Sequence, residues 1–403
     1  MDNGERQKGG IPMKRMFLIA LACTLCLALP AWADTLNGSG SLTGGTYTAA
    51  GDDESAIDVS GTAQASLTGA VIQKTDGKAS SADAASFRGV NAAVRVYDSA
   101  ELTLTDSAIE ASAPNATGVF AYDHGVIHIS DCTVNVTGGG AGGVQVAGGG
   151  TLIGENLTVT SASKAAIRSD RGGGTLILTG GSYTSTGQNG CPAIYSTADI
   201  AVSDAVCISE QSRAVIIEGK NTVTLTNCTL TGNDQSTKEG SVRANVLLYQ
   251  SASGDAKEGT SVFTMEGGEM TAKSGAMFYC TNTASVINLK EAQLNLSDTG
   301  DLLIVAAGRW GKENRNGGNC TLNAKNQALA GQVTVDAVSA LQMNLSASAF
   351  TGAITGEGQI SLTLDESSAW TLTGDSVLTS FEGNPDQINA NGYSLYVGGV
   401  KIL

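Results

Sequence analysis

The sequence has few of the residues that carry acid–base or metal chemistry. Its 403 residues include only 2 His and 5 Pro, 5% are aromatic and 15% are charged, whereas about 25% of residues are charged in ordinary soluble domains. The six Cys after residue 33 form no CxxC pair and have no zinc-site spacing. These shortages disfavour zinc and helical proteins, and the 52 Gly among many small polar residues indicate an all-β chain of short strands.

Basic residues are also scarce. The formal net charge is −15, and both nucleic acids and anionic membranes need clustered positive charge on their protein partners. We therefore expect no nucleic-acid partner. An acidic surface of this kind is typical of a soluble protein outside the cell.

The N-terminus has the pattern of an export signal. Lys14 and Arg15 precede the apolar run 16–29, and the A-x-A site 31–33 follows it. The run is too short for a membrane span. We expect residues 1–33 to be the signal, with 1–12 an upstream extension before the natural start, and we expect no membrane span after its removal. The mature protein would then be secreted, periplasmic or on the surface of a bacterium.

One unit of strand, turn, strand, turn and strand recurs along the chain. Residues 118–138, GVFAYDHGVIHISDCTVNVTG, show it clearly. Its opening strand aligns at steps of 22 to 31 residues in nine copies: AVRVYDSA from Ala93, GVFAYDHG from Gly118, GVQVAGGG from Gly143, AAIRSDRG from Ala165, PAIYSTAD from Pro192, AVIIEGKN from Ala214, NVLLYQSA from Asn245, AMFYCTNT from Ala276 and LLIVAAGR from Leu302.

Such a unit cannot bury its apolar face alone, so the copies must stack. The sequence therefore predicts a right-handed parallel β-helix, a solenoid of about 10–13 coils with a C-terminal cap; the unequal steps disfavour a left-handed hexapeptide helix. We expect an N-terminal cap at 34–55, regular coils at 56–320, and final coils and a cap at 321–403. Trp370, Tyr393 and Tyr396 are expected in that cap.

The repeats between Ala56 and Ala307 resemble the pectate-lyase-like superfamily of right-handed β-helices. Within it they are closest to bacterial adhesin-like and autotransporter-passenger repeats, as are the final ladders at 360–376 and 388–397. We do not expect the membrane barrel of an autotransporter in this sequence. The resemblance implies a fold that hosts lyases, hydrolases, adhesins and toxins, so it does not decide the activity.

The leading hypothesis is an exported, non-enzymatic, adhesin-like protein that binds a glycan or a cell-surface protein. The alternative is a polysaccharide lyase or glycoside hydrolase acting on an acidic or neutral polysaccharide. The repeat register places Asp98, Asp123 and Asp170 in one slot, with His124 and Arg168 nearby. Asp123, His124, Asp170 and Arg168 are weak catalytic candidates.

Tyrosines occupy the slot before these acids. The predicted ligand-binding residues are Tyr97, Asp98, Tyr122, Asp123 and Tyr249. The competing interpretation is that each Asp only hydrogen-bonds its own turn.

No cofactor and no metal site are expected; Ca²⁺ is the single ion for which acids of this face, or those at 52–54, offer ligands. The six remaining Cys are expected to be mostly buried free thiols. Cys207 and Cys228, one coil apart, are the one pair that we single out for a disulfide test.

Overall fold

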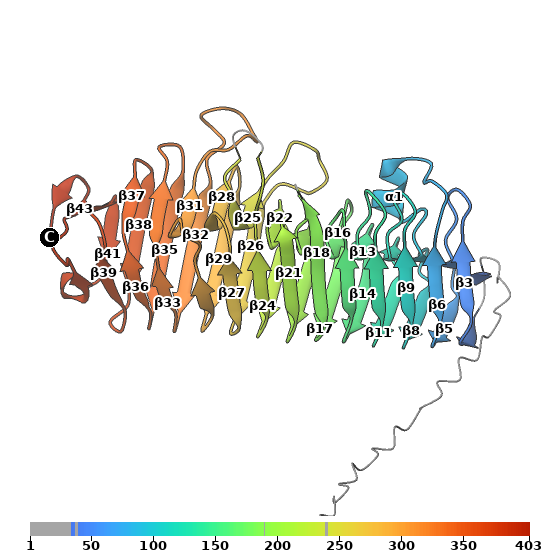
Figure 1. Cartoon of the computed structure of the whole chain (residues 1–403). Coiled ribbons are helices and arrows are strands. Elements are labelled where there is room, and N and C mark those ends of the chain that lie inside the picture. Colours follow the sequence, from blue (N-terminus) through green and yellow to red (C-terminus); the bar gives the residue numbers. More distant parts are fainter. Residues whose placement is uncertain (1–33, 37–38, 189, 238–240) are drawn as a thin grey trace, which may run out of the picture.

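The computed structural model describes residues 34–36, 39–188, 190–237 and 241–403. The predicted export signal, residues 1–33, lies outside the described residues. The described chain forms an elongated solenoid of stacked strands with its C-terminus at one end (Figure 1). None of its helices is long and apolar enough to cross a membrane.

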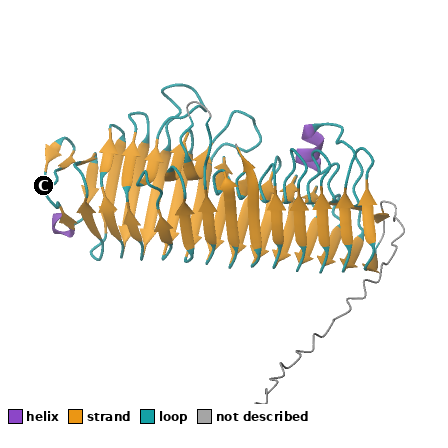
Figure 2. Cartoon of the chain, in the orientation of Figure 1, coloured by secondary structure: helices purple, strands orange, loops and turns teal. Residues whose placement is uncertain are grey.

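Three parallel sheets run along the solenoid (Figure 2). The first sheet has 13 strands in the described residues: β1 (Asp34–Leu36), β4 (Ile57–Val59), β7 (Val94–Val96), β10 (Val119–Tyr122), β13 (Val144–Ala147), β16 (Ile167–Ser169), β19 (Ile194–Ser196), β22 (Val215–Glu218), β25 (Ala244–Tyr249), β28 (Ala276–Thr281), β31 (Asp301–Val305), β34 (Gln332–Val335) and β37 (Ile354–Gly356).

The second sheet follows the first around each coil. It has 14 described strands: β2 (Gly40–Thr43), β5 (Gln64–Thr68), β8 (Glu101–Thr105), β11 (Val126–Ser130), β14 (Gly150–Glu155), β17 (Gly174–Thr179), β20 (Asp199–Ser203), β23 (Thr222–Thr226), β26 (Thr260–Glu266), β29 (Ala284–Lys290), β32 (Asn319–Lys325), β35 (Ala340–Ser346), β38 (Gln359–Leu364) and β41 (Ser380–Glu382).

The third sheet closes each coil. Its 10 described strands are β3 (Thr46–Ala49), β6 (Val71–Lys74), β9 (Ala108–Ala111), β12 (Thr133–Val136), β15 (Thr158–Ser161), β18 (Ser182–Gln188), β21 (Val206–Gln211), β24 (Thr229–Gly232), β27 (Glu269–Ala272) and β30 (Gln293–Asn295). A 4-stranded sheet continues this position in the last coils: β33 (Ala328–Ala330), β36 (Ala349–Gly352), β39 (Ala369–Leu372) and β42 (Ile388–Asn389).

In these sheets each strand pairs in parallel with its copy one coil later, which confirms the predicted parallel β-helix. Segment 34–55, predicted to be an N-terminal cap, contains β1, β2 and β3, and these already pair with β4, β5 and β6. The C-terminal end contains a 3-stranded sheet of β40 (Ser376–Leu378), β43 (Leu395–Val397) and β44 (Val400–Lys401). The short 3-10 helix η1 (Pro385–Gln387) lies between β40 and β43 in the chain.

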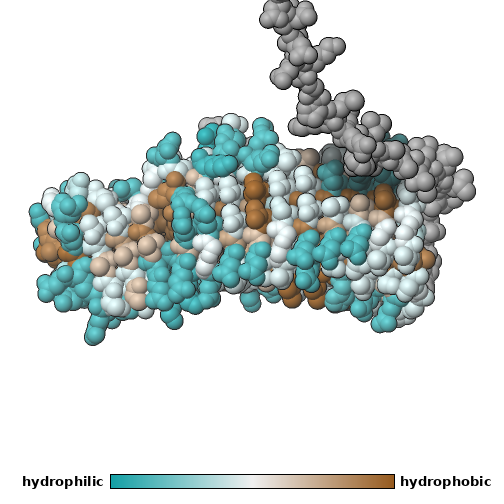
Figure 3. All heavy atoms as spheres, turned by 60° about the horizontal axis from the view of Figure 1, so that its bottom comes forward, coloured by the Kyte–Doolittle hydropathy of each residue, from teal (hydrophilic) through white to brown (hydrophobic). Residues whose placement is uncertain are grey.

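Alternating apolar and polar side chains determine which face of each strand points into the lumen. In β11, Ile127 and Ile129 are buried while Val126, His128 and Ser130 are partly exposed, as expected for a strand with one face in a lumen. Equivalent apolar side chains from all coils form one continuous core. The face in Figure 3 is mostly hydrophilic or neutral, with a few hydrophobic stripes.

The longer connections project on the same edge of the solenoid (Figure 1). One contains helix α1 (Ala82–Arg88), which begins where the Ser81 side chain accepts a hydrogen bond from the Ala84 N–H and ends at Gly89 in the left-handed region. This connection covers the outer face of the first sheet, where Phe120 is fully buried although it points away from the lumen.

The register corrects the sequence alignment at several coils. Val144 pairs with Ile167, whereas the alignment paired it with Ala166. Asp170 therefore lies level with Ala147 and Tyr122 and does not share the slot of Asp98 and Asp123. The reason is physical: the expected register would turn Arg168 into the lumen and Ile167 outward, because a one-residue slip reverses every side chain.

The C-terminal coils contain a large buried aromatic pair. Trp370 is fully buried, its ring stacks on Phe350 with centroids 5.8 Å apart, and its Nε1–H donates to the Gly352 carbonyl at 3.0 Å. Tyr393 and Tyr396, expected beside it in the cap, are 42% and 38% exposed. The lumen of the last coils is therefore closed around Trp370 and not around the tyrosines.

We expect Trp370→Ala to destabilise the protein by about 3–5 kcal/mol, since it removes a fully buried aromatic side chain. Because coils contact only their neighbours, the loss should concentrate in the last coils. Hydrogen exchange should show lost protection at 321–403, with 56–250 unchanged. Tyr393→Ala is the matched control and should change stability by less than about 0.5 kcal/mol; uniform loss of protection along the chain would contradict the expectation.

Candidate functional site

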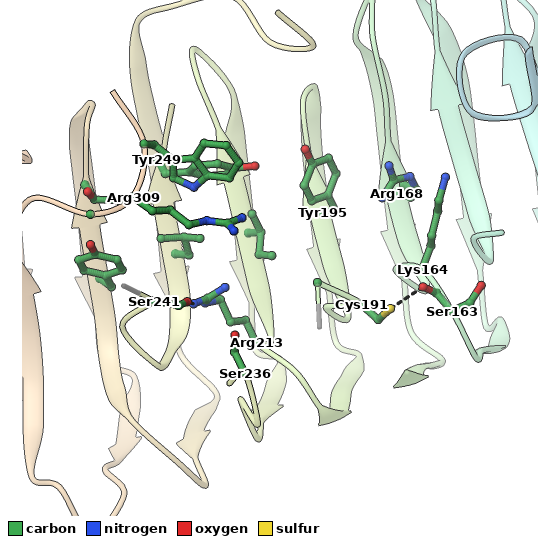
Figure 4. A pocket seen from close by; sticks show the side chains of 17 residues that line it. Ser163, Lys164, Arg168, Cys191, Tyr195, Arg213, Ser236, Ser241, Tyr249 and Arg309 are labelled. Atoms are coloured by element: carbon green, nitrogen blue, oxygen red, sulfur yellow. Dashed lines mark hydrogen bonds between the residues drawn. The ribbon is translucent and has the colours of Figure 1, made fainter. Parts of the chain in front are cut away.

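A pocket of about 450 Å³ lies on the outer face of the first sheet, along β16, β19, β22, β25 and β28 (Figure 4). We call it the cationic pocket. Its described lining residues are Ser163, Lys164, Arg168, Gly190, Cys191, Tyr195, Arg213, Ile216, Ser236, Ser241, Leu247, Tyr249, Tyr279, Thr281, Gly308, Arg309 and Trp310.

The floor of the pocket is a row of outward-facing residues from successive coils. Arg168 pairs with Tyr195, Tyr195 with Ile216, Ile216 with Leu247 and Leu247 with Tyr279. Their chain neighbours, such as Ile167 and Ile194, face the lumen and are fully buried. The lumen therefore fixes which side chains form the floor, at a spacing of ~4.8 Å per coil.

Buried Glu218 orients two of the aromatic rings. Its carboxylate is 1% exposed and accepts hydrogen bonds from the Tyr195 hydroxyl at 2.5 Å and the Tyr249 hydroxyl at 2.8 Å. The Ser251 hydroxyl also donates to it. These contacts fix the ring positions, and burial raises the pKa of both tyrosines, so both hydroxyls stay protonated donors at neutral pH.

One end of the pocket is formed by the connection between β31 and β32. The Asn316 side-chain amide donates to the Gly308 carbonyl at 2.6 Å and the Trp310 carbonyl at 2.9 Å. Gly308 lies against Tyr279, where a Cβ would stand 2.5 Å from the phenol oxygen. This close approach places Trp310 with its ring 5.7 Å from that of Tyr249 and beneath the Arg309 guanidinium.

Two of the four cations in the pocket are held by buried carboxylates. Arg168 lies 2.7 Å from Asp170, and Arg213 lies 3.1 Å from Asp234. Burial alone would lower the pKa of Arg168, but the attraction and hydrogen bonds of Asp170, together with the influence of Tyr195, outweigh it, so the pKa of Arg168 is raised. Burial lowers the pKa of Arg213, and the attraction of Asp234 opposes this. Both guanidinium groups are therefore held in place by a buried carboxylate.

The other two cations have no carboxylate partner among the described residues. Lys164 donates to the Ser86 hydroxyl at 2.7 Å, and the Arg309 guanidinium lies over the Trp310 ring at 4.2 Å. Burial, and then the charge of Arg168, lower the pKa of Lys164 to about 8. The pocket thus keeps unpaired positive charge at both ends (Figure 4).

The predicted site residues divide between this pocket and the turns. Arg168 and Tyr249 line the pocket. Asp170 lies behind it, 2% exposed, where it accepts hydrogen bonds from Arg168 and from the Gln145 amide at 2.8 Å. It is not among the described residues that line the pocket.

The other predicted residues lie toward the N-terminal coils. Asp98, Asp123 and His124 are exposed in turns with φ of 59°, 47° and 62°. Tyr97 lies beneath Arg95, and Tyr122 packs beside Phe120 under the α1 connection. The structure does not bring Asp98, Asp123 and His124 into the pocket.

Sequence reasoning missed most of the pocket. Tyr195 and Tyr279 could have been found from the corrected register, since both follow an inward-facing apolar residue. The segment at 309–315, RWGKENR, also has an unusual density of basic residues for this chain. The missed lining residues with charged or aromatic side chains are Lys164, Tyr195, Arg213, Tyr279, Arg309 and Trp310.

Metal binding finds no support in side-chain clusters. Within the described ranges, no group of three or more His, Cys, Asp or Glu side chains could hold a metal ion. The acids at 52–54 instead accept backbone hydrogen bonds, from Lys78 to Asp52, from Ser80 to Asp53 and from Gly51 to Glu54.

Comparison with known proteins supports the fold. The family model described as "Right handed beta helix region" matches residues 87–258. Together with the three parallel sheets, this match makes the chain a right-handed parallel β-helix, as predicted. No curated protein and no solved structure matches the chain.

We expect the amine of Lys164 to titrate near pH 8 because it is buried beside Arg168. Carbon-13 dimethylation of lysines followed by NMR measures this directly, and Lys164→Arg assigns the signal by removing it. The unfolded chain releases this proton at higher pH, so the folded state gains stability as pH rises from about 8 toward the unfolded value. Titration of the assigned signal above pH 10 would show that the amine is not buried as described.

Proposed function

We propose that this protein is an exported, non-enzymatic, adhesin-like binding protein that takes an acidic glycan into the cationic pocket. One observation carries the proposal. In a chain of net charge −15, the described residues that line the pocket include four cations and no Asp or Glu. A pocket of this size suits a short segment of a ligand chain.

The chemistry of the lining matches carboxylated sugars. Lys164 and Arg309 form no ion pair with a described carboxylate, and Asp170 attracts the Lys164 amine only from a longer distance. The planar guanidinium of Arg309 can bind a carboxylate through two parallel hydrogen bonds. Tyr195, Tyr249 and Trp310 would offer apolar contacts to sugar rings, beside the guanidinium groups that lie over the rings of Tyr195 and Trp310. A neutral glycan would leave the cations unused, so we favour an acidic one.

The arrangement along the solenoid axis favours a polymer. Floor residues recur once per coil from Arg168 to Tyr279, so successive units of an extended chain would meet successive coils. Export, which the segment 1–33 predicts, would place this pocket where cell-surface and extracellular glycans occur. A cell-surface protein is the other partner class expected from the sequence, and failure of every glycan to bind would favour it.

The second candidate function is β-elimination on the same acidic glycan. It is favoured by Lys164, because an amine with a pKa of about 8 is partly neutral at working pH and can abstract a proton. Arg168 lies close enough to influence that pKa and would stabilise a substrate carboxylate. This differs from the enzyme hypothesis drawn from the sequence, whose acids Asp98 and Asp123 lie outside the pocket.

We expect acidic uronate oligosaccharides to bind with higher affinity than neutral ones, and Arg309→Ala or Trp310→Ala to weaken binding about tenfold each, the cost of one lost cation or aromatic contact. Calorimetry on purified 34–403 with a uronate oligosaccharide series measures this. Lys325→Ala, which removes an exposed cation from the second sheet, is the matched control and should leave affinity unchanged. Equal binding of neutral and acidic oligosaccharides would reject the proposal.

The same samples separate binding from catalysis. A binding protein leaves the oligosaccharide intact with and without Ca²⁺, whereas elimination produces unsaturated chain ends. Product formation that Lys164→Met abolishes and Asp123→Ala does not would establish the lyase. Product formation abolished by Asp123→Ala alone would instead support the face predicted from the sequence.

Affinity for the acidic ligand should fall as pH rises through about 8, because Lys164 then loses its charge. The charged or titratable groups around this amine are Arg168, Asp170 and Cys191; the guanidinium keeps its charge, and burial raises the pKa of the Cys191 thiol. Lys164→Arg should bind equally at pH 7 and pH 9, and an unchanged pH dependence in this variant would assign the effect elsewhere.

A further inference from the structure

The lumen contains two cysteines whose thiols contact each other. The Sγ atoms of Cys280 and Cys320 are 3.5 Å apart, and both residues are fully buried. Cys280 lies in β28 of the first sheet and Cys320 in β32 of the second sheet, one coil later. The two thiols therefore meet across a corner of the lumen although 40 positions separate them in sequence.

The other cysteines are placed differently. The thiol of Cys132 donates to the Ser130 carbonyl, and that of Cys228 donates to the Thr226 carbonyl. Each of these thiols therefore hydrogen-bonds the backbone of its own turn. Cys207, which we singled out from the sequence with Cys228, pairs with Leu230 in the ladder. The six cysteines among the described residues are all buried and unbonded, as expected for most of them, but the contacting pair is not the one singled out from the sequence.

We propose that Cys280 and Cys320 are joined by a disulfide when the chain folds in an oxidising environment. Two thiols lose two electrons and two protons as the S–S bond forms. A disulfide oxidant of the glutathione class accepts them, its own S–S bond breaks, and two molecules of its thiol leave. Export would supply such an environment, but the proposal does not depend on the ligand of the cationic pocket.

Burial fixes when this bond can form. The reactive species is the thiolate, and the hydrogen bond from Cys280, together with burial, holds the pKa of Cys320 well above its usual value. In the closed solenoid both residues are fully buried, so an oxidant cannot reach either sulfur atom. The bond must therefore form before the coils around β28 and β32 close, and the folded dithiol protein should resist oxidation.

The crosslink would also constrain the cationic pocket. The chain between the two cysteines contains the connection that carries Arg309 and Trp310, and Cys320 lies just beyond its end. Cys280 directly follows Tyr279, which faces the pocket. A bond in the lumen would therefore fasten the end of this connection to the strand that it packs against.

The test compares oxidation during folding with oxidation after folding. In the first sample, purified 34–403 is unfolded and reduced, then refolded with oxidised glutathione. In the second sample, the folded and reduced protein is incubated with the same oxidant. Both samples are denatured with iodoacetamide and digested without reductant for mass spectrometry. We expect the Cys280 and Cys320 peptides to be linked, lacking two hydrogens, after oxidative refolding only, with the other four cysteines alkylated.

Variants keep the result specific. Cys280→Ser and Cys320→Ser should each abolish the linked peptide, while Cys132→Ser, the matched control, should retain it. If a variant fails to refold, alkylation of wild-type protein during export from living cells gives an independent measurement of the same linkage. Full alkylation of Cys280 and Cys320 after oxidative refolding, or linkage of either to another cysteine, would overturn the proposal, and crosslinking of the folded dithiol would overturn the order of events.

Discussion

The structure depends on one constraint: each strand must keep the same residues facing the lumen as the strand one coil earlier. Because side chains alternate with a period of two, an error of one residue would bury polar side chains and expose apolar ones. Ile167, Ile194 and Val215 meet this constraint in succession. Because side chains alternate, the outward-facing residues beside them are then also aligned in ladders, and no further signal in the sequence is needed to align them.

The same constraint explains how an acidic chain builds a cationic pocket. Outward Arg168 and Tyr195 need partners for their polar atoms, and the partners are carboxylates behind the floor, Asp170 and Glu218, both nearly fully buried. Asp234 does the same for Arg213. The acids stabilise the lining from behind by binding neighbouring side chains, so that cations and aromatic rings, and no carboxylates, line the pocket.

A feature of the fold or the pocket could be predicted when the sequence pattern that determines it lies within a few consecutive residues. Alternation within a strand is local, and it gave the parallel solenoid and the outward direction of residues such as Tyr249. The corners carry no such pattern, so the alignment between Val144 and Ala166 was wrong by one residue and Asp170 was misplaced. Requiring that Arg168 stay out of the lumen would have corrected it.

The remaining features depend on contacts between distant segments. Lys164 is buried against Ser86, 78 residues away, and Trp310 reaches Tyr249 only because a long connection folds back over the sheet. Loop length alone does not determine such contacts. The six pocket residues missed from the sequence come from corners, loops or the corrected ladder, which is where repeat patterns give least information.

Strand β28 shows how the two faces of the sheet are linked. Tyr279 faces the pocket and Cys280 the lumen, and the Tyr279 hydroxyl donates to the Ala307 carbonyl at 3.3 Å. A side chain that moved in the lumen at this point would therefore move the support of Trp310. Because packed interiors are close to fully dense, the lumen residues beneath the floor determine the shape of the pocket although none of them can touch a ligand.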